Sequence, residues 1–404
     1  MTGMELDKLR STDNIDVAGK RVLVRADLNV PTQGGEVTDT TRITRFLPTV
    51  QDLARRGARV IILSHFGRPK GVAVAEMTLA PVAAKMSDLM GNITVGFASD
   101  CIGDTAANAV SAMSDGDVLL LENLRYHAGE EKNDADFAKE LAKLGDIYVN
   151  DAFSCSHRAH ASTAAIAKIL PSYAGGSMMK EVTALRTALD NPARPVVAVV
   201  GGAKVSTKIP VLKNMVAKVD KLIIGGGMAN TFLHAQGINV GKSLCEPDFA
   251  STVGEILSAA AEANCKILLP VDAVVASEFK AGAVMGTFDI ASIPDDGMIL
   301  DVGPASLASL NDEIAECRTL LWNGPLGAFE IEPFGEGTFG LAGTAADLTV
   351  KGQLTTIAGG GDTVAALNDA NAADRFTYIS TAGGAFLEWL EGRELPGIVA
   401  LTSY

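Results

Sequence analysis

The chain has 404 residues, a length that favours two domains over one. Hydrophobic residues make up 48% of the chain and charged residues only 20%, which indicates a well-packed globular protein and excludes an intrinsically disordered one. The formal net charge of −14 argues against a nucleic-acid-binding surface, because binding to a phosphate backbone needs a basic face.

The cysteines and the N-terminus bear on the compartment. The chain has 5 widely spaced cysteines and no CxxC pair, which is typical of reduced thiols in a cytosol. Cys155 lies near His157, but sequence proximity alone does not make a nucleophile and its base, and we reject that interpretation. Residues 1–14 lack the apolar region of an export signal, and no apolar run approaches the ~20 residues of a membrane span. We therefore expect a cytoplasmic protein without membrane or nucleic-acid partners.

From Lys20 the first half of the chain alternates short β-rich apolar runs with helical stretches. This pattern is typical of a parallel sheet that helices cover on both faces, an α/β fold. Ligands of such open sheets bind beyond the carboxyl ends of the strands, so the side chains that follow each strand are the candidates for a site. The expected strands are residues 21–24, 59–63, 93–97, 118–121 and 146–149.

Basic side chains follow several of these strand ends. His65 and Arg68 follow the second strand, Arg125 follows the fourth and Arg158 the fifth. In so acidic a chain this grouping predicts an anion-binding pocket rather than unrelated surface ion pairs. A guanidinium suits that task because its planar fork binds carboxylate or phosphate with two hydrogen bonds. The charges of residues 126–137 are expected to be solvated.

Asp27 and Asn29 follow the first strand and supply hydrogen-bond acceptors. An anion pocket needs acceptors only for a hydroxyl of the ligand, so this pair predicts a small molecule with both an anion and an alcohol. Arg42 is expected early in the next helix, where the residues alone indicate an ordinary exposed arginine.

Turn-forming residues at 171–177 separate the two halves of the chain. A segment with helical spacing follows and ends at Asn191 and Pro192. We therefore expect an N-terminal domain over residues 1–173 and a C-terminal domain over residues 174–390 that starts with an interdomain helix.

Glycines follow strand after strand in the second half. Main-chain N–H groups at glycines can approach a ligand closely, and a helix N-terminus adds a partial positive charge, so this half is expected to bind a polyphosphate. The expected strands are residues 196–200, 221–224, 266–269, 320–322, 354–358 and 378–381, and the glycine segments are residues 201–202, 225–227, 324–327, 359–361 and 383–384.

Four charged residues near these loops have open roles. Asp362 follows the glycines at 359–361 and can cap a helix, but beside a phosphate it would repel unless Mg²⁺ lay between them. Lys204 and Lys208 could reach a phosphate together if a helix had begun, and two exposed lysines are the alternative. Glu330 is either a solvated charge or an acceptor for ribose hydroxyls.

These parts together predict phosphoryl transfer. One half offers cations and hydroxyl acceptors, the other offers main-chain amides, two lysines and an aspartate, and neither half offers an evident nucleophile or base. Water must be excluded, so we expect closure about a hinge. A nicotinamide dehydrogenase would need a GxGxxG fingerprint in the early strands, and a non-catalytic binding protein would leave Lys204, Lys208 and Asp362 without a role.

Nine motifs occur in order along the chain. They are RADLNVP (25–31), SHFGRP (64–69), LLENLRYH (120–127), NDAFSCSHRAHAS (150–162), GGAKVSTKI (201–209), GGGMANTFL (225–233), WNGPLGAFE (322–330), GGGDT (359–363) and STAGGAFLEWLEGRELPG (380–397). Over essentially its whole length the sequence resembles the phosphoglycerate kinase family. The resemblance implies two Rossmann-like domains, with a tail over residues 391–404 that packs on the N-terminal one, and a monomer. It also implies reversible Mg²⁺-dependent transfer of phosphate from 1,3-bisphosphoglycerate to ADP, giving 3-phosphoglycerate and ATP.

The resemblance also implies a role for each candidate residue. The expected 3-phosphoglycerate ligands are Asp27, Asn29, Arg42, His65, Arg68, Arg125 and Arg158. The expected nucleotide ligands are Gly202, Ala203, Lys204, Lys208, Gly225, Gly226, Gly227, Asn323, Gly324, Pro325, Glu330, Gly359, Gly360, Gly361, Asp362 and Thr363, with Asp362 also on the metal. The expected catalytic residues are Arg42, Lys204, Lys208, Gly360 and Gly383. Arg42 would approach the transferring group and, with Lys204, offset the charge on its equatorial oxygens.

The chain departs from the family pattern in two places. Ala26 and Leu28 replace the apolar residues usual between the first ligands, which is a packing change. Ala382 stands where the family usually has the first of three glycines, and it would be strained if that position needed a positive φ.

Overall fold

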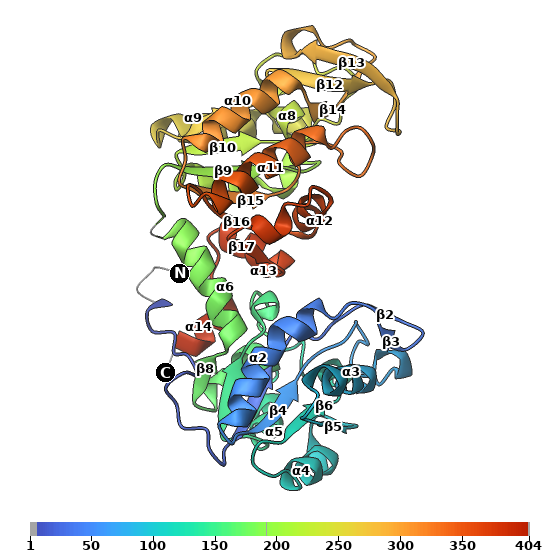
Figure 1. The fold of residues 1–404 in the computed structure, drawn as a ribbon, viewed down its shortest axis with the longest axis vertical. Helices are drawn as coiled ribbons and strands as arrows, with labels where there is room; N and C mark the ends of the chain where they lie inside the picture. The colour runs from blue at the N-terminus through green and yellow to red at the C-terminus, as the bar shows by residue number, and fades with distance from the viewer. Residues whose placement is uncertain (1–5, 191, 403–404) are drawn as a thin grey trace. The chain divides into compact units, whose positions relative to one another are not determined.

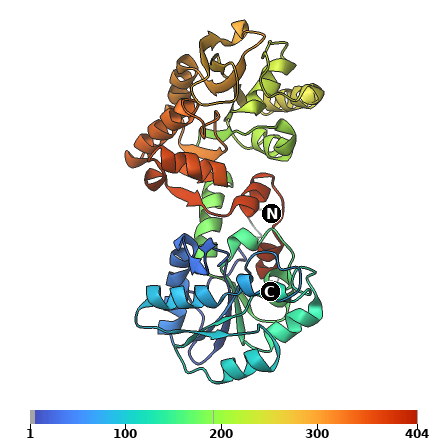
Figure 2. The ribbon, with the colours of Figure 1, turned by 90° about the vertical axis from the view of Figure 1, so that its right-hand side faces the viewer.

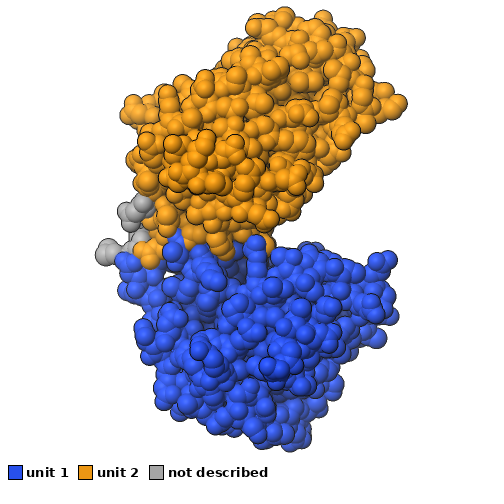
Figure 3. Space-filling view, viewed as in Figure 1, with its two compact units in different colours: residues 1–183, 394–404 blue, residues 184–393 orange. Residues whose placement is uncertain are grey.

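The computed structural model describes residues 6–190 and 192–402. The chain divides into a first unit, Met1–Thr183 with Glu394–Tyr404, and a second unit, Ala184–Arg393 (Figure 3). The division falls inside helix α6 (Gly176–Leu189), which both units therefore share. The boundary expected at residue 173 stays a prediction.

The first unit is built on a parallel sheet in the order β5-β6-β4-β1-β7-β8. Helices flank this sheet (Figures 1 and 2). The strands are β1 (Arg21–Arg25), β4 (Arg59–Leu63), β5 (Val95–Ala98), β6 (Val118–Leu121), β7 (Ile147–Asn150) and β8 (Ser172–Ala174), and the helices are α2 (Thr41–Arg55), α3 (Ala80–Met90), α4 (Gly103–Ser111) and α5 (Ala135–Ala142). Strands β4 and β6 have the predicted bounds. The prediction of a turn cluster is wrong at residues 172–174, which form the edge strand β8.

The second unit has a parallel sheet of its own, in the order β11-β10-β9-β15-β16-β17. Its strands are β9 (Val196–Val200), β10 (Lys221–Ile224), β11 (Lys266–Leu268), β15 (Thr319–Asn323), β16 (Thr355–Gly359) and β17 (Tyr378–Ser380). Its helices are α7 (Ile209–Val216), α8 (Gly227–Ala235), α9 (Ala250–Glu262), α10 (Pro304–Ala315), α11 (Glu336–Val350), α12 (Gly361–Asp369) and α13 (Gly383–Leu390). Two α/β units, each with a parallel sheet flanked by helices, confirm the predicted fold class.

Two further sheets were not predicted. In the second unit, β12 (Asp272–Ala276), β13 (Val284–Asp289) and β14 (Met298–Val302) form an antiparallel sheet in the order β13-β12-β14 (Figure 1). In the first unit, β2 (Thr32–Gln33) pairs with β3 (Glu36–Val37) in a small hairpin. Residues of β13 are mostly exposed and lack an apolar run, so no strand pattern marks them.

Continuous apolar runs explain why the central strands form and where the cores lie. All five residues of β9 are buried, as expected for a parallel strand that is covered on both faces. In the first unit, Val22, Val24, Val60 and Ile62 of β1 and β4 belong to one buried cluster. These rigid sheets carry the loops that follow each strand.

The last described helix, α14 (Pro396–Thr402), packs against β8 of the first unit. The N–H of Gly397 donates to the main-chain oxygen of Ser156 at 2.9 Å. The side-chain nitrogen of Asn150 donates to the main-chain oxygen of Gly397 at 3.3 Å. Within residues 6–190 and 192–402, no helix is both long and apolar enough to cross a membrane.

Candidate functional site

At the carboxyl edge of the first sheet, Arg42 holds the loop that follows β1. Its Nη1 atom donates to Oδ2 of Asp27 at 2.8 Å and to the main-chain oxygen of Asn29 at 3.0 Å. The Oδ1 atom of Asn29 accepts from the N–H of Gly67, in the loop after β4, at 2.9 Å. Arg42 is the second residue of α2, as predicted. The structure therefore brings these three expected ligands together.

His65 and Arg25 form the buried part of this edge. The Nη2 atom of Arg25 lies 3.1 Å from Nδ1 of His65, and its Nε donates to Oγ of Ser162 at 2.8 Å. Burial, together with the charges of Arg25, Arg125 and Arg158, holds the pKa of His65 well below its usual value. Because a guanidinium only donates, Nδ1 of the neutral imidazole accepts and its Nε2–H is left to donate.

Arg25 was not among the expected site residues, and a buried glutamate balances its charge. Glu130 is fully buried, and its carboxylate accepts from the N–H of Ser162 at 3.0 Å and from its Oγ at 2.6 Å. Burial raises the pKa of Glu130, and the charge of Arg25 opposes that shift. The prediction that the charges of residues 126–137 are solvated is therefore wrong for Glu130. No sequence signal separates this residue from its exposed neighbours.

The remaining cations differ in exposure. Arg125 is buried, and its Nη1 donates to the main-chain oxygen of Gly67 at 2.7 Å. Arg158 is half-buried, and its Nε donates to Nε2 of His157 at 3.1 Å. Arg68 is exposed in the loop after β4. Arg125 and Arg158 both lower the pKa of His65, which places their charges near one another at this edge.

In the second unit, hydrogen bonds join the loops after β15 and β16. Lys208 donates from Nζ to Oδ1 of Asn323, whose Nδ2 donates to the main-chain oxygen of Gly359 at 2.7 Å. The N–H of Gly324 donates to Oγ1 of Thr363 at 2.7 Å. Burial lowers the pKa of Lys208, and the charge of Asp362 opposes that shift. Five expected nucleotide ligands therefore take part in these hydrogen bonds.

Glycines of neighbouring loops pack main chain against main chain. Gly226 has a φ of +67°, and a Cβ there would lie 2.6 Å from the oxygen of Gly202. Gly324 has a φ of +105°, and its Cβ would lie 2.2 Å from the oxygen of Gly201. A side chain at either position would be strained and would clash. Packing between loops is thus a second reason why these two positions require glycine, besides the close approach of the main chain to a ligand.

The other expected residues lie at or just before the first turns of helices. Gly360 precedes α12 with a φ of +103°, and Asp362 lies exposed in the first turn of that helix. Helix α7 begins only at Ile209, so Lys204, which is exposed, and Lys208 do not share a helical face. Ala382 has a φ of −98°, so the strain considered for this alanine is absent and Gly383 begins α13 as an ordinary helical residue.

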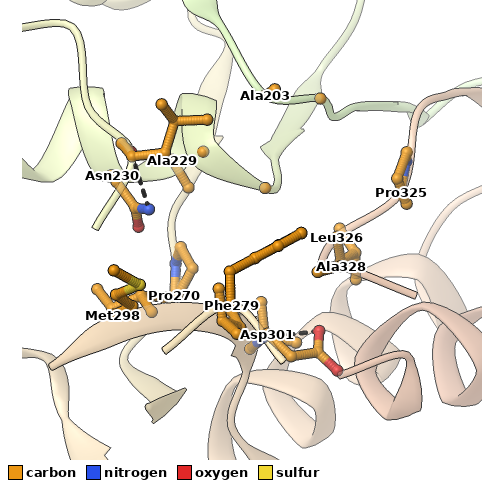
Figure 4. Close-up of a pocket in the computed structure, with 18 of the residues that line it drawn as sticks. Ala203, Ala229, Asn230, Pro270, Phe279, Met298, Asp301, Pro325, Leu326 and Ala328 are labelled. Atoms are coloured by element: carbon orange, nitrogen blue, oxygen red, sulfur yellow. Dashed lines mark hydrogen bonds between the residues drawn. The ribbon is translucent and has the colours of Figure 1, made fainter. Parts of the chain in front are cut away.

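A cavity of about 590 Å³ opens among these loops in the second unit (Figure 4). Its walls include expected nucleotide ligands, namely Gly202, Ala203, Gly226, Gly227, Pro325, Glu330 and Asp362. The other lining residues were not named as ligands, although Leu326 and Gly327 lie in an expected glycine segment. They are Ala229, Asn230, Lys242, Leu244, Pro270, Phe279, Met298, Ile299, Leu300, Asp301, Val302, Leu326, Gly327 and Ala328. Most of these are apolar, and several come from the antiparallel sheet that the sequence did not reveal.

Asp301 is a buried carboxyl group in this wall. Its Oδ2 accepts from the N–H of Gly337, in the first turn of α11, at 2.9 Å, and its Oδ1 accepts from the N–H of Val302 at 2.8 Å. Burial raises the pKa of Asp301 to about 7. The one signal in the sequence is that this aspartate follows the apolar residues at 298–300.

The donor atoms indicate where a magnesium ion fits. Asp362 presents an exposed carboxylate at the cavity, and Mg²⁺ prefers one or two carboxylates completed by water and substrate phosphates. Among the described residues, two clusters have ligand atoms within 4.8 Å of one another, namely Asp27 with His65 and Cys155, and Asp100 with Cys101 and His127. Each cluster combines one carboxylate with an imidazole and a thiol, and burial raises the pKa of both thiols. This donor set differs from the all-oxygen ligands that Mg²⁺ prefers.

Comparison with known proteins agrees with this arrangement. The family model described as phosphoglycerate kinase matches residues 12–393. The chain is 62% identical over 383 residues to a phosphoglycerate kinase of Methylorubrum extorquens (strain PA1), with 95% of this chain and 96% of that protein covered. It is 61% identical over 389 residues to one from Rhizobium meliloti (strain 1021), with 96% and 97% covered.

A solved structure extends the likeness to the fold. The phosphoglycerate kinase of Coxiella burnetii superimposes with a TM-score of 0.91 at 45% sequence identity, and 98% of this chain and 99% of that chain are covered. With sequence, fold and family model in agreement over nearly the whole length, the chain belongs to the phosphoglycerate kinase family.

Proposed function

We propose that this kinase, whose family transfers phosphate to a carboxyl group, catalyses reversible Mg²⁺-dependent transfer between 1,3-bisphosphoglycerate and ADP. One observation supports the nucleotide half most directly. The cavity of the second unit combines apolar walls, suited to a nucleobase, with Asp362 in the first helical turn after a glycine loop, suited to phosphates and their metal.

The first unit supplies the groups for 3-phosphoglycerate. Arg125 and Arg158 would bind its anionic ends, and Arg68 would add an exposed charge. Asp27 and Asn29 would accept from its hydroxyl group, and the free Nε2–H of His65 would donate to it. The proposal assigns these residues by their chemistry and by their common place at the carboxyl edge of the sheet.

The second unit supplies the groups for the nucleotide. Its glycine loops leave main-chain N–H groups accessible to phosphates, while Lys204 and Lys208 add positive charge. Asp362 would hold Mg²⁺, which when bound neutralises charge on the phosphate oxygens. Glu330, exposed at the cavity, would accept from ribose hydroxyls.

The chemical step is an in-line displacement. In the direction that consumes ATP, a carboxylate oxygen of 3-phosphoglycerate forms a bond to the γ-phosphorus while the bond from that phosphorus to the β-γ bridging oxygen breaks, leaving ADP. No general base is needed, because the attacking carboxylate is already ionised near neutral pH. Arg42 and Lys204, with main-chain N–H groups at Gly360 and Gly383, would stabilise the charge on the equatorial oxygens.

Direct transfer requires the two bound substrates to meet in the absence of water. We therefore include closure of the two units about a hinge in the proposal. The cytoplasmic location and the monomeric state also stay predictions.

A coupled assay tests the proposal. ATP and 3-phosphoglycerate should yield ADP only when Mg²⁺ is present, and the released ADP is followed by a linked enzyme reaction. Absence of ADP with all three components present would refute the proposed reaction.

A further inference from the structure

Three side chains with metal-binding atoms converge where two neighbouring strands of the first unit end. Asp100 and Cys101 follow β5, and His127 follows β6 and the short helical turn after it. The two strands pair in parallel, with Ala98 opposite Leu121 at their carboxyl ends. One ligand atom from each of the three side chains lies within 4.8 Å of the other two. The proposed function assigns no role to these three residues.

Hydrogen bonds and a ring contact already hold these groups together. The Nε2–H of His127 donates to Oδ1 of Asp100 at 2.7 Å, and the N–H of Cys101 donates to the same oxygen at 2.7 Å. The imidazole also stacks on Phe137 of α5, with ring centroids 5.3 Å apart. Two independent contacts therefore orient the imidazole, and its Nε2 atom is directed at the carboxylate.

The three side chains differ in exposure in a way that suits an ion entering from solvent. Cys101 is buried, whereas the side chains of Asp100 and His127 are 43% and 29% exposed. In a tetrahedral Zn²⁺ site, bonds of about 2.0–2.3 Å separate the ligand atoms by about 3.3–3.6 Å. The oxygen of Asp100 and Nε2 of His127 would therefore move apart by roughly 0.6 Å to admit the ion. Three protein ligands leave a fourth position for water.

The donor atoms and the surrounding charges select the class of metal. Thiolate sulfur, imidazole nitrogen and carboxylate oxygen are all ligands of Zn²⁺, whereas Mg²⁺ prefers oxygen alone. The charges of Asp100, Glu130 and Glu122 all act on Cys101, and together with burial they raise the pKa of its thiol. Negative charges that disfavour a bare thiolate attract a divalent cation to the same place.

The second cluster of this kind among the described residues, Asp27 with His65 and Cys155, is less suited to a cation. The carboxylate of Asp27 is already paired with Arg42 at 2.8 Å. The Nδ1 atom of His65 lies 3.1 Å from the guanidinium of Arg25, and the positive charge of Arg25 also acts on Cys155. A metal ion there would meet fixed positive charge, which the cluster at Cys101 avoids by its acidic surroundings.

We propose that Asp100, Cys101 and His127 bind one Zn²⁺ ion, which joins the loops after β5 and β6 and stabilises the first unit. The ion forms bonds to the sulfur of Cys101, to Nε2 of His127 and to the carboxylate of Asp100. The thiol proton leaves to solvent, and the imidazole proton passes from Nε2 to Nδ1. Zn²⁺ has no redox chemistry, so no electron acceptor or donor is required. The inference does not depend on the proposed reaction.

Cobalt absorption tests for the sulfur ligand. Co²⁺ can occupy a zinc site, and its bond to a thiolate gives a charge-transfer band in the near ultraviolet. The untagged, metal-free full chain should show this band and saturate at one Co²⁺ per chain. Cys101→Ser should lose the band, and Cys155→Ser, which removes the thiol of the other cluster, should keep it. A band that is absent from the wild type, retained in Cys101→Ser or lost in Cys155→Ser would overturn the proposal.

Competition with a chromophoric chelator measures the affinity for Zn²⁺. His127→Gln should weaken binding by roughly 100-fold or more, because loss of an outer partner of a metal ligand alone costs about 10- to 100-fold. His234→Gln, which changes an exposed histidine of the second unit, is the matched control and should bind as the wild type does. Excess Mg²⁺ should not displace the Zn²⁺. Equal affinities of wild type and His127→Gln, or displacement by Mg²⁺, would refute the site.

Thermal unfolding tests the stabilising role. The melting temperature of the wild type should rise with Zn²⁺ concentration, since a ligand of the folded state stabilises it, and the rise should be smaller for Asp100→Asn. Asp100 and His127 are partly exposed, so variants at these positions keep the test decisive if Cys101→Ser fails to fold. A wild-type melting temperature that Zn²⁺ leaves unchanged would contradict the proposal.

Discussion

The Nη1 atom of Arg42 donates to Oδ2 of Asp27 at 2.8 Å, so two residues expected to serve the same substrate are bonded to each other. Asp27 also accepts from Oγ of Ser154 at 2.5 Å. Its carboxylate thus holds the guanidinium in place at the carboxyl edge of the first sheet. A group held in position in advance stabilises developing charge without reorganising.

Replacing Arg42 with alanine should therefore affect turnover more than substrate binding. We expect kcat of Arg42→Ala to fall roughly 100- to 1,000-fold with a smaller change in KM for 3-phosphoglycerate, as for loss of one preorganised donor. Steady-state kinetics of the coupled reaction would show this. Arg55→Ala, at the exposed end of the same helix, is the matched control and should behave as wild type. Unchanged turnover of Arg42→Ala would remove Arg42 from the transition state.

Asp362→Asn should raise the Mg²⁺ concentration that is needed for activity. An amide is a weaker ligand for a hard divalent cation than a carboxylate, so the concentration of Mg²⁺ at half-maximal rate should increase. Titration of activity with Mg²⁺ at fixed ATP measures this. Asp369→Asn, at the other end of α12, should leave the titration unchanged. If both variants matched wild type, the metal would have another ligand.

Packing between the glycine loops should make alanine destabilising at one glycine and tolerated at another. Gly226→Ala places a Cβ 2.6 Å from a main-chain oxygen at a φ of +67°, so we expect the free energy of unfolding to fall by about 1–3 kcal/mol. Gly361→Ala meets no atom within 4 Å and should change it by less than ~0.5 kcal/mol. Urea titration followed by circular dichroism compares them. Equal stabilities would show that the loop relaxes without strain.

The buried carboxyl of Asp301 should make stability depend on pH. Its pKa in the folded protein is about 7, above the value of an exposed aspartate, so the folded state holds this proton more tightly than the unfolded state. Stability from this group is present below about pH 4 and is lost as the pH rises to 7, because ionisation is disfavoured only in the folded state.

The Asp301→Asn variant isolates that effect. The difference in unfolding free energy between wild type and this variant should shrink from pH 4 to pH 7, by up to about 1.4 kcal/mol for each pH unit. Asp296→Asn, at an exposed residue of the same unit, is the matched control. A constant difference for Asp301→Asn would mean that Asp301 ionises alike in both states.

Closure of the two units about a hinge can be tested in solution. We expect the radius of gyration from small-angle scattering to decrease when 3-phosphoglycerate and a non-hydrolysable Mg-nucleotide are both present, and to change less with either alone. A radius that stays constant in the ternary mixture would contradict closure.

Strands with continuous β-branched runs could be predicted from the sequence. Residues 59–63 and 196–200 form strands at the expected bounds, because Val and Ile fill both buried faces of a parallel sheet. The antiparallel strand β13 escaped notice, since its side chains are mostly exposed and carry no such run. The edge strand β8 is short and lies among turn formers, where tertiary pairing outweighs local preference.

The candidate site residues that directly follow a strand could be predicted, because the position and the residue type are both visible in the sequence. Arg125 follows the end of β6 and Asp362 follows the end of β16, as the sequence predicted. The role of Arg25 depends on a partner far away in the chain, namely Ser162, and that contact exists only after folding. The pairing of Gly226 with Gly202 is hidden for the same reason, because it joins loops of different strands.

The position of α14 has a consequence for synthesis on the ribosome. The main-chain hydrogen bond from Gly397 to Ser156 links α14 to the rest of the first unit, although α14 is translated after the entire second unit. Domains usually fold as units in the order in which they emerge. Here the first unit emerges first yet lacks α14 until the whole second unit has been translated, so the second unit can complete its structure before the first one does.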